Sequence, residues 1–209
     1  MAVSEWREKE IILFLQPYME ECYLKTCLAV QKWLDNQAEA VWEELENAIR
    51  KVLYRAGEQQ KLGKGDIQYL AFSFMRYGVC GDEPEIFIEA LDDAFYLDER
   101  ETACCYFPVF LKDRFREDCG ILYRKAGESF VRLQDYELEE IRKGYAGYYS
   151  SILFRMLQGL AGLTVGAVRG SGIPTTDRFT VIYGEYMGQA AVLYREGEDN
   201  EVFHAGNER

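Results

Sequence analysis

Helical hydrophobic patterning runs through the first sixty residues. The pattern predicts a short helix from about residue 3 to residue 15, a break near Pro17, and then one long helix or two consecutive helices ending at Gly57. A glycine at that point is a typical C-terminal stop. In the later part of this stretch, apolar side chains recur every three or four residues and share one helix face: Val41, Leu45, Ile49, Val52 and Ala56.

The hydrophobic period changes to two in two later stretches, as in β-strands. Two such runs on either side of a loop rich in turn-forming residues predict a β-hairpin across about residues 67–93. Two more, around a turn at Met187-Gly188, predict a second hairpin across about residues 179–195. A short extended piece is predicted at Phe95–Leu97. The pattern does not decide whether the two hairpins share one sheet.

Helical spacing returns between the hairpins. It predicts one helix over Pro108–Ala126 and a second that begins near Asp135, in which helical spacing continues for about six turns from Leu138 to Leu160. Asp135 suits the N-cap of the second helix, because its carboxylate can accept backbone N–H groups and complement the helix dipole. Residues 159–174 are rich in glycine and then polar, so we expect a loop there.

These elements predict an α+β fold, with a small antiparallel sheet of two hairpins packed against the helical N-terminal third and the central helical segment. A chain of 209 residues suits a single domain, residues 1–209. We divide it into a helical segment (1–60), the first hairpin (61–98), helices (101–163), the second hairpin (175–196) and an acidic tail (197–209). The residues contain no motif by which we could assign a known family.

Three features bear on the cellular location. Six cysteines show neither a C-x-x-C motif nor a zinc-ligand spacing, so we interpret them as free thiols. The charged N-terminus leads into a short apolar run, Ile11 to Leu15, which does not make a secretory signal. Residues 151–168 are largely apolar, but Arg155 and Gln158 interrupt them, which favours a buried helix end over a membrane span. We therefore predict a cytoplasmic protein without a membrane partner.

The formal net charge of −12 is concentrated in one stretch. Residues 82–101 carry nine acidic side chains and one basic one, a net charge of −8. Such a surface repels phosphate backbones, so we predict no nucleic-acid partner. A basic protein, a cationic ligand or a divalent metal suits it, and so does a purely solvated face. Homo-oligomerisation stays open.

The candidate chemistry is sparse. The single histidine, His204, lies in the acidic tail, and the glycine-rich run 166–172 lacks the lysine of a P-loop. We assign no catalytic residue, cofactor or metal ligand. The residues that best suit a partner or cation surface form a carboxylate cluster at the end of the first hairpin, namely Asp92, Asp93, Asp98 and Glu99.

Two functional hypotheses follow. The first is a non-catalytic binding protein of the inhibitor or immunity type, whose acidic surface engages a basic protein partner. Tyrosines suit such a surface, although they also fill the rims of cores; the candidates are Tyr145, Tyr148, Tyr149, Tyr183, Tyr186 and Tyr194. The alternative is a carboxylate-dependent hydrolase, with the same four acidic residues holding a divalent metal or sharing acid and base roles.

Overall fold

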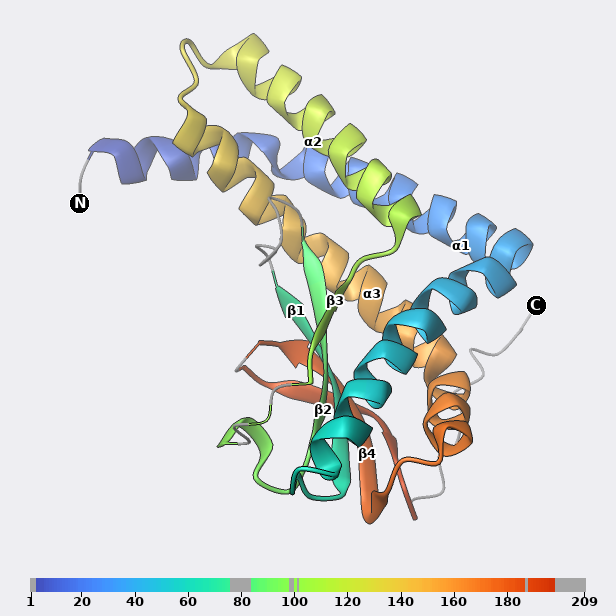
Figure 1. Ribbon diagram of the computed structural model, residues 1–209. Coiled ribbons are helices and arrows are strands. Elements are labelled where there is room, and N and C mark those ends of the chain that lie inside the picture. Colours follow the sequence, from blue (N-terminus) through green and yellow to red (C-terminus); the bar gives the residue numbers. More distant parts are fainter. Residues whose placement is uncertain (1–2, 76–83, 98–99, 101, 187, 198–209) are drawn as a thin grey trace.

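The computed structural model describes residues 3–75, 84–97, 100, 102–186 and 188–197 (Figure 1). It contains three long helices, a short 3₁₀ helix and five strands. In chain order these are α1 (Val3–Gln60), β1 (Ile67–Met75), β2 (Glu85–Leu91), η1 (Phe95–Leu97), β3 (Cys104–Tyr106), α2 (Val109–Ser129), α3 (Asp135–Ser171), β4 (Thr175–Glu185) and β5 (Ala190–Arg195).

The five strands form one sheet in the order β3-β2-β1-β4-β5. Strands β1 and β2 pair antiparallel, as do β4 and β5, so both predicted hairpins are present. The hairpins share the sheet because β1 and β4 pair in parallel, with Leu70 opposite Val181. The predicted α+β class is therefore confirmed, and the sheet is mixed rather than antiparallel throughout. Helices α2 and α3 provide the long crossover that a parallel pairing requires.

The helices divide the molecule into two ends. The first half of α1 packs with α2 and the first half of α3 into a three-helix bundle, as Figure 1 shows. The second half of α1 then runs along the sheet, and α3 extends from the bundle to the start of β4. Alternate strand residues such as Leu70, Phe72 and Ile88 join the main core, while Ala71, Leu91 and Ile182 form a small cluster on the other side of the sheet.

The predicted break at Pro17 is wrong, because α1 continues through this residue. A proline inside a helix removes one backbone hydrogen bond and crowds the preceding turn. Leu15 and Met19, on either side of Pro17, are buried in the bundle, and this packing holds the helix together across the defect. The kink lies instead at Gln37, whose backbone is not helical (φ −138°, ψ 31°).

The predicted loop at residues 159–174 is also wrong, because α3 continues to Ser171 and ends at Gly172 in the left-handed conformation (φ +69°). Val165 and Val168 are buried, and their burial offsets a helix cost of about 1 kcal/mol for each interior glycine. Among the described helices, α3 alone is long and apolar enough to cross a membrane. Core helices of soluble proteins can have the same length and apolar composition.

Two local predictions shift by a small amount. The N-cap of α3 is Gln134 rather than Asp135, since the Gln134 backbone N–H donates to Glu137 Oε2 at 2.8 Å in a capping box. Phe95–Leu97 forms the 3₁₀ helix η1 rather than an extended piece, and Phe95 packs edge-on against Tyr69 at 5.0 Å. The acidic tail lies outside the described residues from position 198 onward.

Candidate functional site

Asp92 and Asp93 follow strand β2, whereas Asp98 and Glu99 lie outside the described residues. The Asp92 side chain is buried, with 7% of its surface exposed. Its two carboxylate oxygens accept backbone N–H groups, Oδ2 from Gly65 at 3.1 Å and Oδ1 from Ala94 at 3.0 Å. Asp92 therefore ties the loop after β2 to the turn before β1, and of this adjacent pair only Asp93 is exposed.

A buried lysine accompanies Asp92. Lys64 is 5% exposed, and its ammonium group donates to the backbone carbonyl of Arg100 at 3.3 Å. Burial lowers the pKa of Lys64, and the nearby carboxylates of Asp92 and Glu89 oppose this shift. A Cβ added to Gly65 would lie 3.2 Å from the Asp92 Cβ, so the glycine lets the two segments meet. We call this arrangement the Asp92 joint.

The tyrosines proposed for a partner surface divide into two groups. Tyr145 and Tyr149 are fully buried and Tyr183 is 5% exposed, so these three belong to the core. Tyr148 and Tyr194 are half-buried and Tyr186 is 40% exposed, and only these are placed to contact another molecule.

Tyr145 and Tyr149 both donate to a buried carboxylate that the sequence analysis did not single out. Asp118 on α2 is fully buried. Its Oδ2 accepts hydrogen bonds from three hydroxyl groups: Thr26 Oγ1 at 2.8 Å, Tyr145 OH at 2.7 Å and Tyr149 OH at 3.1 Å. Arg114 lies 3.5 Å from the other oxygen. These donors come from all three helices of the bundle, and we call the group the Asp118 cluster.

The chemistry of the Asp118 cluster is that of a structural centre. Burial raises the pKa of both tyrosines and raises that of the neighbouring Cys119 to about 12, so all three stay protonated at neutral pH. A nucleophile or general base would need a pKa near the working pH and access to substrate. Among the described residues, no group of three or more histidine, cysteine, aspartate or glutamate side chains is arranged to hold a metal ion.

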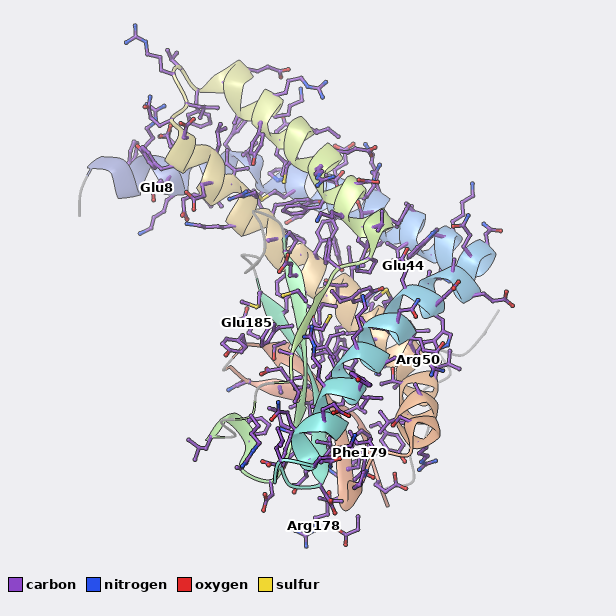
Figure 2. All side chains as sticks on the ribbon, viewed as in Figure 1. Glu8, Glu44, Arg50, Arg178, Phe179 and Glu185 are labelled. Carbon is purple, nitrogen blue, oxygen red and sulfur yellow. The ribbon has the colours of Figure 1, made fainter. Side chains whose placement is uncertain are left out.

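A run of acidic side chains lies on α1, around the kink at Gln37. Five acidic side chains follow one another there, and the sequence has no lysine or arginine between Lys32 and Arg50. Residues 35–40 are all exposed. We call this surface the acidic elbow, and it consists of Asp35, Glu39, Glu43, Glu44 and Glu46. Figure 1 shows the bend, and Figure 2 labels Glu44 and Arg50 on the second half of α1.

Aromatic packing anchors the acidic elbow to the rest of the bundle. The ring of Trp33 stacks on Phe110 of α2, with 4.6 Å between centroids and an interplanar angle of 18°. The Trp33 indole N–H donates to the side chain of Gln37 at 2.9 Å, at the kink itself. Glu46 pairs with Arg50 at 2.7 Å. The bend is therefore held by specific contacts, and three of its acidic side chains are exposed on this support: Asp35, Glu39 and Glu43.

A groove of about 720 Å³ lies between the last turns of α1 and residues 170–174. Its two cationic side chains are already engaged within the chain, because Arg50 pairs with Glu46 and Lys61 pairs with Glu58 at 2.6 Å. Gln60 spans the groove floor and donates to the carbonyl groups of Gly65 and Pro174. These polar groups hold the surrounding segments together.

Comparisons with known proteins add no assignment to this geometry. No family model matches the chain, and neither the curated proteins nor the solved structures contain a significant match.

Proposed function

We propose that this chain is a non-catalytic binding protein that presents an acidic surface to a basic protein partner, in the manner of an inhibitor or an immunity protein. The observation that carries the proposal is the acidic elbow, which has five acidic residues without an intervening base around a kinked helix; Asp35, Glu39 and Glu43 are exposed, and Glu44 and Glu46 are half-buried. Asp93 adds a second exposed acidic position at the far end of the molecule.

The physical support lies in the placement of the charges. The Asp92 and Asp118 carboxylates already accept hydrogen bonds from within the chain, so they contribute little to an external surface. The acidic residues of the elbow stand on a support fixed by Trp33 and Phe110. A concentrated negative surface accelerates encounter with a positive partner and suppresses binding to acidic competitors.

We also propose that the protein acts in the reducing cytoplasm. The five cysteines in the described residues are free thiols, which is the usual state there: Cys22, Cys27, Cys104, Cys105 and Cys119.

The experiment that tests the binding proposal is affinity capture from the source cell's lysate at low and moderate salt, with mass spectrometry and a binding measurement on the purified partner. The test variant is Glu39→Lys/Glu43→Lys, because lysine keeps helix propensity while the net charge changes by four. We expect a basic partner whose affinity falls at least about fivefold in this variant and also falls as salt rises.

The matched control is Asp66→Lys/Asp177→Lys, which makes the same charge change at two exposed positions outside the helices. We expect the control to bind nearly as the parent does. A separate Asp93→Lys variant reports on the surface predicted from the sequence. Partner binding that is unaffected by salt, by Glu39→Lys/Glu43→Lys and by Asp93→Lys would contradict the proposal.

A further inference from the structure

The first half of α1 carries large apolar side chains on the face turned away from the bundle. Trp6 is 67% exposed, Leu13 69%, Leu24 61% and Leu28 74%, and Pro17 is exposed between them. A soluble protein rarely exposes a continuous apolar surface of more than a few hundred Å² without a use for it. We call these five residues the outer stripe.

The spacing of the outer stripe places it on one straight line along the helix. Its members lie seven, four, seven and four residues apart, which is an eleven-residue repeat of about 3.67 residues per turn. At about 100° per residue, all five fall within an arc of about 60°. This arc faces directly away from the buried residues Ile11, Leu15 and Met19. The stripe is about 33 Å long.

The size of the outer stripe suits a protein interface. Its exposed fractions correspond to roughly 550 Å² on one molecule, so complete burial in a pair would cover about 1,100 Å², just above the minimum of about 1,000 Å² for a specific interface. A groove of about 570 Å³ lies beside Trp6 and Leu13, with Phe14 in its wall. The groove gives an incoming apolar side chain room to pack against the indole ring.

We propose that the outer stripe is a self-association surface, at which a second copy of this chain docks antiparallel about a two-fold axis near Pro17. In this arrangement Leu13 of each copy lies beside Leu24 of the other, and Trp6 lies beside Leu28. Each contact occurs twice, as in every isologous interface.

The charges that flank the outer stripe favour a second copy over other occupants. Antiparallel pairing about Pro17 brings Glu10 of each copy near Lys25 of the other, and it sets Glu20 beside the neutral Gln16. The Lys25 side chain is 61% exposed and pairs with Glu21, which is also exposed. An anionic membrane is disfavoured, because Glu10 lies within the arc of the stripe and Glu20 and Glu21 border it.

This surface is separate from the acidic elbow, so the two proposals stand or fall independently. The test is sedimentation equilibrium of the full chain from about 1 to 200 µM, because interfaces near 1,000 Å² have affinities that differ widely. We expect the parent to approach twice the monomer mass. The Leu13→Glu/Leu24→Glu variant should stay monomeric at every concentration and keep the parent's circular dichroism and melting temperature.

Two further variants make the test specific. Leu62→Glu/Leu163→Glu changes two exposed leucines outside the stripe and should still dimerise. Glu10→Lys should weaken association several-fold, and Glu10→Lys/Lys25→Glu should restore it. A parent that stays monomeric at 200 µM overturns the proposal, as does a Leu13→Glu/Leu24→Glu variant that still dimerises. Failure of the charge exchange to restore association overturns the antiparallel arrangement.

Discussion

Each end of this molecule contains one buried aspartate that joins neighbouring segments. The two aspartates accept hydrogen bonds from different kinds of donor. In the bundle, the Asp118 carboxylate accepts side-chain hydroxyl groups from α1 and α3. At the far end of the sheet, Asp92 accepts backbone N–H groups from two loops. The hydroxyl donors to Asp118 stand 27 to 92 residues away in the sequence, while the backbone donors to Asp92 stand 2 and 27 residues away.

The comparison shows what each carboxylate specifies. The Asp118 cluster fixes how three helices pack, because its hydroxyl donors converge only when all three are in place. The Asp92 joint fixes how one hairpin closes, because its donors are backbone groups that most sequences could supply. Asp118 is buried in an apolar bundle, so its charge has a larger desolvation cost than that of Asp92. Loss of its hydrogen-bond partners should therefore lower the free energy of unfolding more.

The largest effect is expected from Asp118→Ala. The substitution removes the shared acceptor of three buried hydroxyl groups, while Arg114 keeps its contact with Glu117 at 2.9 Å, and we expect a loss of about 3–5 kcal/mol in the free energy of unfolding. Urea denaturation followed by circular dichroism measures it. The control is Asp113→Ala on the same helix, where the exposed aspartate pairs with Arg116 and should cost less than about 1 kcal/mol. Equal losses in the two variants would refute a structural role for the cluster.

A smaller effect on the free energy of unfolding is expected at high pH. Its sign differs between the tyrosines of the Asp118 cluster and Lys64 at the Asp92 joint. Burial raises the pKa of Tyr145 and Tyr149, so the unfolded chain releases these protons near pH 10 while the folded chain keeps them. Stability is then intact below pH 10 and falls by up to about 1.4 kcal/mol per tyrosine for each pH unit above it. Lys64 acts in the other direction: its pKa is lowered, so its contribution rises with pH up to about 10.5.

Urea denaturation between pH 8 and pH 11 measures how the free energy of unfolding depends on these opposing contributions. We expect the free energy of unfolding to fall above pH 10 in the parent and to fall less steeply in Tyr145→Phe. Lys64→Met should remove the opposing rise and leave the alkaline fall in place. The same alkaline slope in the parent and in Tyr145→Phe would show that the buried tyrosine does not drive the loss.

The smallest effects are expected at the Asp92 joint. Asp92→Ala removes two backbone hydrogen bonds and the countercharge of Lys64, for a loss of about 2 kcal/mol. Gly65→Ala should cost about 1 kcal/mol, because its new Cβ crowds the same carboxylate, and the double variant should lose less than the sum. Gly57→Ala is the control: its Cβ meets open space inside α1, so it should stabilise by up to about 1 kcal/mol. If the loss in the double variant equals the sum of the two single losses, Gly65 and Asp92 act independently.

Much of the fold could be predicted from local pattern. Strand alternation located both hairpins, and helical spacing located α2 and most of α3. The errors at Pro17 and at residues 159–174 share one cause, because proline and glycine lower helix propensity while the burial of Leu15, Met19, Val165 and Val168 overrides it. The parallel pairing of β1 with β4 depends on contacts between distant segments, which local periodicity does not encode.

The candidate site was predictable only in part. Counting acids identified residues 82–101, but it could not distinguish the buried Asp92 from the exposed Asp93. The acidic elbow had an equally simple signal, the absence of any base from residue 33 to residue 49, which a search for the densest run of acids overlooks. The sequence also contains a signal for Asp118, because its helical spacing places it between Phe115 and Leu122 on the buried face of α2.

The kink at Gln37 has a consequence for how the protein can vary. Because the regular helix restarts just after the kink, Glu39 lies in its first turn, where the partial positive charge of the helix dipole stabilises a carboxylate by about 0.3–1 kcal/mol. Negative charge can therefore accumulate at the elbow with little penalty to folding. A lineage could exchange or add acidic residues at this position to follow a changing partner, while the bundle and the sheet stay as they are.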